Sequence, residues 1–443
     1  MNKRRPIFLS AAWVLLSMSA ANAAGKTFTV TYPRATEPGA LQLDATYMLW
    51  IPDGGKQLRA VIVHQHGCGF DANRAGETAA HDLHWQALAA KWDAALLAPR
   101  YTQMEQGREG CDLWSDPRNG SAKTFFRALD AFAVASGHAE LKTAPWCLWG
   151  HSGGAFWVSL MQTLAPERIV AAWLRSGTAF AWWESGGTAK PEITDALYGI
   201  PTMLNPGIKE SINEKPEAAW LGSMAMFKAY RARGAPIAFA ADPLSGHDCG
   251  DSRYLAIPFF DACLESRLPE KSDGSQPLRA LDVKQGWRAE LMGRVAVPVE
   301  KFAGKANVSV WLPNERIAKA WMEYVTTGAT TDTTPPPAPT KVAVAPPADG
   351  SVVITWECAA DFESGLQSFL IERDGQPLGQ VPEKPVGKFG RPLFQTLSFH
   401  DTPEQPLPPM RFVDTTATPG AKHAYRIIAI NAAGLKSPAS HAR

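Results

Sequence analysis

A serine flanked by glycines constrains the fold of this chain more than any other sequence feature. Residues 150–154 read Gly-His-Ser-Gly-Gly, an apolar run over 145–149 precedes them, and a helix-like stretch over 155–164 follows. A strand that ends in a sharp turn before a helix holds a serine hydroxyl exposed, and side chains in place of the flanking glycines would clash. The sequence therefore predicts Ser152 as an exposed nucleophile on a strand–turn–helix unit.

Short apolar runs alternate with helix-like stretches on both sides of this motif. Strands are expected at 59–64, 94–98, 170–174, 201–204 and 236–240, and helices at 85–92, 124–135 and 217–233. Such alternation is typical of an α/β fold, in which helices cover both faces of a mostly parallel sheet.

A proline-rich segment divides the chain into two parts of different character. Residues 332–339 read Asp-Thr-Thr-Pro-Pro-Pro-Ala-Pro, a composition typical of a stiff, extended linker. Strand signals follow it at 351–356, 368–373 and 424–429, with an Asp-Gly hairpin turn at 374–375. The predicted organisation is a signal peptide at 1–23, an α/β domain at 24–330, a linker at 331–340 and an all-β sandwich at 341–443.

The first residues are typical of an export signal. A basic start at 3–5 precedes an apolar run over 7–18, and Ala-Asn-Ala at 21–23 offers small residues for cleavage. That run is short for a membrane span, and no other stretch is long and apolar enough to be one. We therefore expect a periplasmic or secreted protein without a membrane span. The formal net charge of +1 gives no reason to expect nucleic acid as a partner, and a monomer is expected.

The base that takes the proton from Ser152 should lie beyond the last core strands. His247, within Ser-Gly-His-Asp at 245–248, follows the strand at 236–240. No other histidine lies between Ser152 and residue 400, and His400 belongs to the C-terminal part. His247 is therefore the predicted base.

The acid that orients His247 has more than one candidate. Glu210 follows the strand at 201–204 and gives the chain order serine, acid, histidine that this fold uses. Asp242, at the end of the next strand, is the alternative. Asp248 is disfavoured because adjacent side chains diverge. Glu210 is the predicted acid.

Two backbone N–H groups are needed to stabilise the oxyanion that forms during acyl transfer. Gly153, directly after the nucleophile, supplies one, and Cys68, in the loop His-Gln-His-Gly-Cys-Gly at 64–69, is predicted to supply the other. Four histidines near this loop could be imagined as metal ligands: His64, His66, His81 and His84. No clear set of further ligands accompanies them, so structural roles are expected and no metal or cofactor is required.

Three tryptophans on loops are expected to line the substrate cleft: Trp114, Trp182 and Trp183. Aromatic walls suit a sugar or an aromatic acyl group. Core packing is expected for Trp146, Trp149 and Trp157.

The loop at 64–69, the run Cys-Asp-Leu-Trp at 111–114 and the serine motif resemble the polyhydroxyalkanoate-depolymerase-like esterases, a group similar to acetylxylan and feruloyl esterases. The resemblance covers about residues 59–268. It implies an α/β-hydrolase fold and a disulfide between Cys68 and Cys111 that ties the oxyanion loop to the Cys-x-x-Trp loop. The chain departs from the group at its predicted acid, which is usually Asp, and at His151, where an apolar residue usually precedes the serine.

The C-terminal part resembles a fibronectin type III module from about residue 335 to the end. Trp356, the Asp-Gly hairpin, and the ending from Tyr425 through Asn431 to Ser437-Pro438 carry this resemblance. Residues 382–410 are longer and richer in proline than the pattern. Such modules most often act as spacers, and binding of an insoluble polymer is the other role considered.

Four further cysteines lie outside the implied disulfide. Buried free thiols are expected for Cys147 and Cys358. Fourteen residues of continuous helix between Cys249 and Cys263 would separate them by about 21 Å, beyond disulfide reach. They could pair only if the helix begins late, near Leu255, and both outcomes stay open.

Together these residues predict a carboxylic ester hydrolase that works through an acyl-enzyme on Ser152. The expected partner is an ester substrate, possibly polymeric: acetylated or feruloylated plant polysaccharide, or aliphatic polyester. A secreted serine peptidase is the first alternative, because the same relay cleaves amides. A binding protein that kept the fold and lost activity is the second.

Overall fold

The computed structural model describes residues 13–15, 25–54, 57–69, 76–103, 110–212, 217–270, 276–345, 350–418 and 420–441. Most of the predicted export signal lies outside these residues. The strand β1 (Trp13–Leu15), which belongs to the predicted export signal, pairs antiparallel with β2 (Gly25–Tyr32). No helix in the described ranges has both the length and the apolar character needed to cross a bilayer.

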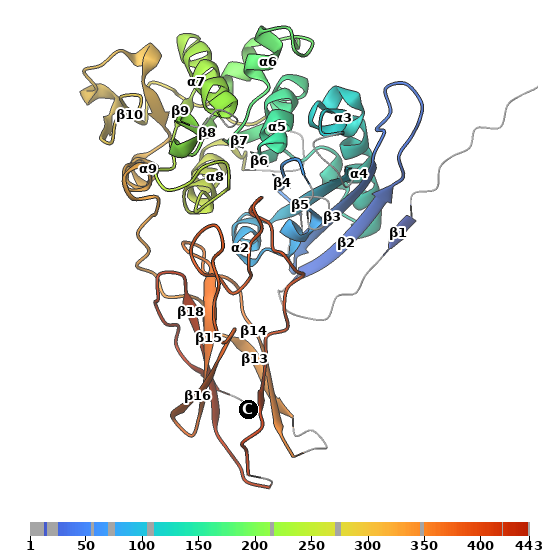
Figure 1. Ribbon diagram of the computed structural model, residues 1–443, viewed down its shortest axis with the longest axis vertical. Coiled ribbons are helices and arrows are strands. Elements are labelled where there is room, and N and C mark those ends of the chain that lie inside the picture. Colours follow the sequence, from blue (N-terminus) through green and yellow to red (C-terminus); the bar gives the residue numbers. More distant parts are fainter. Residues whose placement is uncertain are drawn as a thin grey trace, which may run out of the picture.

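A nine-stranded sheet forms the centre of the N-terminal part (Figure 1), in the order β1-β2-β3-β5-β4-β6-β7-β8-β9. Its further strands are β3 (Asp44–Pro52), β4 (Ala60–Gln65), β5 (Ala94–Thr102), β6 (Trp146–His151), β7 (Ile169–Arg175), β8 (Thr202–Asn205) and β9 (Ile237–Phe239). The strands from β5 to β9 in this order pair in parallel, whereas β2 and β3 are antiparallel. The predicted mostly parallel α/β-hydrolase sheet is confirmed.

The helices cover both faces of this sheet. Every residue of β4, β6 and β7 is buried, and successive side chains of a strand point to opposite faces, so neither face is open to solvent there. The α-helices are α2 (Leu83–Lys91), α3 (Asp112–Ser115), α4 (Ser121–Ser136), α5 (Gly153–Leu164), α6 (Phe180–Glu184), α7 (Glu217–Ala232), α8 (Arg253–Arg267) and α9 (Glu315–Thr327). Short 3-10 turns, η1 (Gly76–His81), η2 (Pro117–Asn119), η3 (Ala139–Lys142), η4 (Pro166–Arg168), η5 (Asp195–Gly199), η6 (Ile208–Ser211), η7 (Val299–Lys301) and η8 (Ala306–Val308), join them.

A small antiparallel sheet between α8 and α9 has no counterpart among the predicted elements. Its strands are β10 (Trp287–Ala289), β11 (Ala296–Pro298) and β12 (Val310–Leu312), with β10 in the middle. Strands of three residues are too short to show a hydrophobic period, which is why the sequence did not indicate them.

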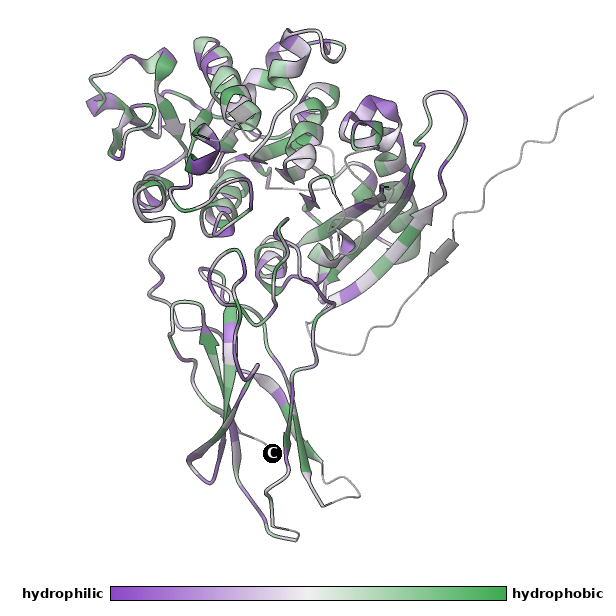
Figure 2. Cartoon of the chain, viewed as in Figure 1, coloured by the Kyte–Doolittle hydropathy of each residue, from purple (hydrophilic) through white to green (hydrophobic). Residues whose placement is uncertain are grey.

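The C-terminal module is all β, as predicted. One sheet contains β13 (Thr340–Ala345), β14 (Val352–Glu357) and β17 (Arg411–Asp414), and the other contains β15 (Leu366–Arg373), β16 (Gln376–Val381), β18 (Tyr425–Asn431) and β19 (Ser440–His441). Side chains of both sheets share one core, in which Trp356 of β14 packs against Phe369 of β15 with ring centroids 5.2 Å apart. Figure 2 shows hydrophobic segments along strands of this module and of the central sheet.

The C-terminal module packs directly against the α/β part, with α2 at the junction (Figure 1). Leu83 of α2 is buried in the core of the module. His84 Nε2 donates to the carbonyl oxygen of Phe362 at 2.9 Å, and Gln395 Oε1 accepts from the backbone N–H of Leu83 at 2.9 Å. The two parts therefore share apolar and polar contacts along α2.

A buried ion pair spans the same junction. Arg253, at the start of α8, donates to Asp82 Oδ2 at 2.7 Å and to Asp401 Oδ1 of the module at 2.9 Å. Each of these three side chains is at most 2% exposed. Asp401 Oδ2 also lies 3.3 Å from His64 Nε2. Buried charges of this kind are costly unless paired, and here each carboxylate lies within hydrogen-bond distance of the Arg253 guanidinium.

Asp401→Asn is expected to reduce the loss in the free energy of unfolding that occurs between pH 7 and pH 3. Burial alone would raise the pKa of Asp401, but Arg253 and His64 outweigh it and lower this pKa to about 2. The folded pKa is thus below the unfolded value of about 3.9, so the carboxylate contributes about 2 kcal/mol above pH 4, of which about 1 kcal/mol is lost by pH 3. Urea unfolding at pH 7 and pH 3 should show a loss about 1 kcal/mol smaller in the variant. Equal losses in the two proteins would contradict this assignment.

Candidate active site

Ser152 lies at the tip of the sharp turn between β6 and α5. Its φ of +54° is in the left-handed region that non-glycine residues rarely adopt. A Cβ on Gly150 would lie 2.4 Å from the carbonyl oxygen of Gly154, and a Cβ on Gly154 would lie 2.4 Å from that of Gln65. Both flanking glycines are therefore required by close backbone approach, and the turn presents the serine hydroxyl at the end of the sheet.

His247 and Glu210 complete a line of three side chains with Ser152. His247, on the loop after β9, places its Nε2 2.9 Å from Ser152 Oγ. Its Nδ1 lies 2.5 Å from Glu210 Oε1 on η6. Glu210 is fully buried, and its Oε2 accepts from the backbone N–H of Gly207 at 3.0 Å. Because the carboxylate accepts the Nδ1 hydrogen, Nε2 is left free to accept the serine proton.

The carboxylates of the two alternative acids hydrogen-bond to backbone N–H groups and not to the His247 ring. Asp242 Oδ1 accepts from the backbone N–H groups of Leu244 and Ser245, at 2.9 and 3.3 Å. Asp248 likewise accepts from nearby backbone N–H groups. Both carboxylates shape the loop that carries His247, and the structure brings Glu210 to the imidazole.

The predicted oxyanion donors lie beside each other at the N-terminus of α5. A disulfide joins Cys68 to Cys111, with the Cα atoms 5.6 Å apart. A Cβ on Gly153 would lie 3.5 Å from the backbone nitrogen of Cys68 and within contact of both sulfur atoms. The disulfide therefore lies against Gly153, the residue after Ser152, where backbone N–H groups and the helix dipole favour negative charge.

The double variant Cys68→Ser/Cys111→Ser is expected to lower kcat for p-nitrophenyl acetate about 10- to 100-fold. Removal of one oxyanion donor costs about 10²–10³-fold in kcat. The effect should be smaller here because the loss of the disulfide loosens the donor without removing it. The free energy of unfolding should fall by about 2–4 kcal/mol, so rates are compared well below the variant's melting temperature. Cys358→Ser, a free thiol of the C-terminal module, is the control. A double variant with unchanged kcat would show that the disulfide does not fix the donor.

The prediction of a place in the cleft is wrong for two of the three tryptophans. Trp114 is fully buried and stacks on Tyr101 with ring centroids 4.9 Å apart. Trp183 is also buried, so neither ring has surface to offer a substrate. Trp182 is 56% exposed and lies edge-on to Phe156 of α5; its contact with substrate stays a prediction. The tryptophans expected in the core, Trp146, Trp149 and Trp157, are buried.

The remaining cysteines are free and buried: Cys147, Cys249, Cys263 and Cys358. The open question about Cys249 and Cys263 is thus resolved against a bond. The helix α8 begins at Arg253 and carries Cys263 within it.

The histidines of the oxyanion loop have structural contacts. His64 stacks on Trp149 with ring centroids 4.0 Å apart, and His66 accepts from the backbone N–H of Tyr101 at 3.3 Å. Burial lowers the pKa of His66 to about 4. Within the described ranges, the cluster of side chains close enough to share a metal ion is Asp332, Asp361 and Glu363, which includes no histidine. These contacts agree with the structural roles expected for the histidines.

Arg175 is a site residue that the sequence analysis missed. It ends β7, is fully buried, and donates to Ser245 Oγ at 2.6 Å and to the carbonyl oxygens of Asn205 and Gly246, at 2.9 and 3.1 Å. A guanidinium with several fixed donors can hold such a loop in one shape. Arg175 therefore organises the loop that carries His247. The sequence signal that could have indicated Arg175 was a charged residue directly after the apolar run at 170–174.

No protein-family model and no curated protein matches the chain. Among solved structures, an S-formylglutathione hydrolase from Agrobacterium tumefaciens is 15% identical, with a TM-score of 0.37 and coverage of 57% of this chain and 97% of that chain. An acetyl xylan esterase from Paenibacillus sp. R4 is 15% identical, with a TM-score of 0.38 and coverage of 58% and 89%. An Fn3-like protein from Clostridium thermocellum is 17% identical, with a TM-score of 0.16 and coverage of 25% and 91%.

Proposed function

We propose that this chain is an exported carboxylic ester hydrolase that works through an acyl-enzyme on Ser152. The observation that carries the proposal is the line of contacts from Ser152 Oγ to His247 Nε2, at 2.9 Å, and from His247 Nδ1 to Glu210, at 2.5 Å. A buried carboxylate, an imidazole and a serine held in a strained turn are the parts that acyl transfer needs.

The proposed reaction has two halves. Ser152 Oγ attacks the ester carbonyl carbon while His247 Nε2 takes its proton, and Glu210 stabilises the imidazolium that forms. The backbone N–H groups of Gly153 and Cys68 stabilise the oxyanion. His247 then returns the proton to the leaving alcohol, and water attacks the acyl-enzyme by the same relay, which releases the acid and restores Ser152.

The substrate proposed is an acetyl or feruloyl ester of plant polysaccharide, or an aliphatic polyester. An exported enzyme meets such polymers outside the cell. The exposed ring of Trp182, next to Phe156 on the helix that follows Ser152, offers an aromatic surface for a sugar or an aromatic acyl group.

A panel of esters and amides tests this function. Purified protein should hydrolyse p-nitrophenyl acetate and butyrate with an initial burst of p-nitrophenol, and should leave peptide p-nitroanilides uncleaved. Rates on methyl ferulate, acetylated xylan and polyester film, measured side by side, then identify the acyl group and alcohol. Failure to cleave any ester, or faster cleavage of the amides, would overturn the proposal.

A further inference from the structure

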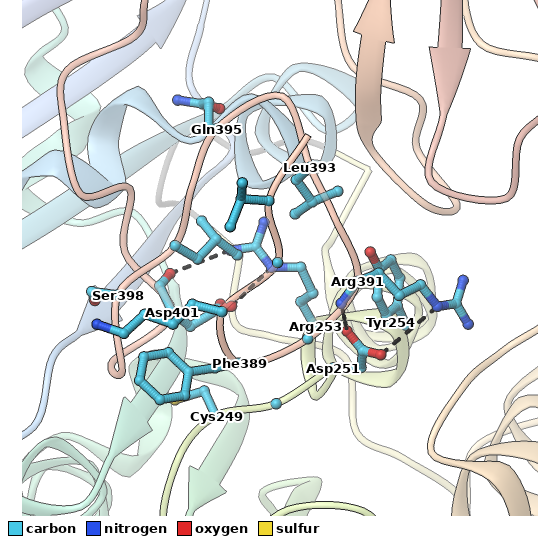
Figure 3. Close-up of a pocket in the computed structure, with 16 residues that line it drawn as sticks. Cys249, Asp251, Arg253, Tyr254, Phe389, Arg391, Leu393, Gln395, Ser398 and Asp401 are labelled. Atoms are coloured by element: carbon cyan, nitrogen blue, oxygen red, sulfur yellow. Dashed lines mark hydrogen bonds and ion pairs between the residues drawn. The ribbon is translucent and has the colours of Figure 1, made fainter. Parts of the chain in front are cut away.

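The C-terminal module sends a long loop to the active site. This module loop, residues 382–410, joins β16 to β17 and lies against the loop that carries His247. The carbonyl oxygen of Phe399 accepts from the backbone N–H of Cys249 at 3.3 Å. Asp251 Oδ1 accepts from the backbone N–H of Arg391 at 2.8 Å, and Figure 3 shows this contact near that between Arg253 and Asp401. The module loop therefore holds the segment that follows His247 at two points, Cys249 and Asp251.

A chain of two hydrogen bonds continues from the module loop to His247 itself. His400 Nδ1 lies 2.8 Å from His151 Nδ1. His151 Nε2 lies 2.6 Å from the carbonyl oxygen of His247. His400 and His151 are buried. Since His151 directly precedes Ser152, its ring bridges the nucleophile turn and the backbone of the base.

The directions of these two bonds follow from the chemistry of the groups. A carbonyl oxygen only accepts, so His151 Nε2 carries a hydrogen. Burial lowers the pKa of His151 well below its usual range and that of His400 to about 3, so both rings are neutral at pH 7. Neutral His151 therefore has no hydrogen on Nδ1, and His400 Nδ1–H must donate to it.

This donor and the carbonyl oxygen of His247 together select the tautomer of His151 that carries its hydrogen on Nε2. If nothing donated to Nδ1, His151 could carry its hydrogen there instead, and the carbonyl oxygen of His247 would lose its partner. A second group that selects the tautomer of a functional histidine is a known way to fix its orientation. The peptide plane of His247, and with it the direction of its imidazole toward Ser152, depends on that bond.

We propose that His400 of the C-terminal module is a positioning residue that acts through His151 to hold His247 in line with Ser152 and Glu210. The proposal rests on the proposed function for its kinetic test. It also gives His151, the departure from the esterase pattern before the serine, a partner and a role. The C-terminal module is thereby a working part of the active site and more than a spacer.

Variants of His400 test the proposal. His400→Leu should lower kcat for p-nitrophenyl acetate about 10- to 100-fold, the cost of a small misplacement of a catalytic group, and leave KM within about twofold. His400→Asn places an amide N–H where Nδ1–H was and should recover most of kcat. His400→Gln, equally polar, carries its amide one bond farther out and should not, which decides the matter if the leucine variant does not fold. His423→Leu, another module histidine that contacts Asp374, is the control and should match the wild type.

A spectroscopic arm separates this proposal from the proposed function. In protein labelled with ¹⁵N-histidine, His151 should be protonated on Nε2 alone and His400 on Nδ1, and the resonances of His247 should move in His400→Gln but not in His423→Leu. If the wild type cleaves no ester, the function fails and these resonances still decide the positioning role. Unchanged kcat in both His400→Leu and His400→Gln, equal loss in the asparagine and glutamine variants, or unmoved His247 resonances would overturn it.

Discussion

Replacing Ser152 with alanine is expected to lower kcat for p-nitrophenyl acetate on the order of 10⁶-fold, the effect of removing the nucleophile where triad members act as a unit. The rest of the site stays in place, so substrate binding and folding should change little. The side-chain hydrogen bond of Ser152 recorded among the described residues is the one with His247, which keeps the substitution local.

Initial rates and thermal melting curves of Ser152→Ala and wild type give the comparison. Ser185→Ala removes an exposed serine from the same domain, one that donates to the carbonyl oxygen of Trp182, and should behave like the wild type. A residual rate within tenfold of wild type in Ser152→Ala would mean that another group attacks the ester.

Glu210→Gln is expected to lower kcat by about 10⁴-fold, because the wrong tautomer of the base results. The backbone N–H of Gly207, 3.0 Å from Glu210 Oε2, would hold the amide oxygen of glutamine. The amide N–H₂ would then point at His247 Nδ1 and donate to it. His247 would carry its hydrogen on Nε2 and could not accept the proton of Ser152.

Asp242→Asn is the matched comparison, since Asp242 was the alternative acid and contacts the backbone of the same loop. Its effect on kcat should be less than about tenfold, the scale of an indirect positional change. A larger loss of kcat in Asp242→Asn than in Glu210→Gln would reverse the assignment of the acid.

The nucleophile turn was predictable because its requirements are local. The fully buried strand β6, the close approach of Gly150 to the backbone of Gly154, and the helix after Ser152 all lie within one short segment, so a few residue types specify them. Glu210 followed from chain order, since the acid of this fold comes after a core strand and before the histidine.

The parts that sequence reasoning missed depend on packing between distant segments. Arg175 reaches the loop of His247 from a strand end, and His400 reaches His151 from another module. The sequence carries no mark of either approach. Trp114 was expected on a loop that lines the cleft, yet it lies in the short helix α3, where its ring stacks on Tyr101 and is buried. Exposure of a loop residue is set by what packs over it, which only the tertiary structure shows.

Covalent labelling with a fluorophosphonate, followed by peptide mass spectrometry, tests the identity of the nucleophile without any assumption about substrate. A serine activated by a histidine reacts with such reagents because they mimic the tetrahedral stage of acyl transfer. We expect one adduct per wild-type chain, located on Ser152, and none in Ser152→Ala. An adduct on another residue, or no adduct in a protein that hydrolyses esters, would contradict the triad of Ser152, His247 and Glu210.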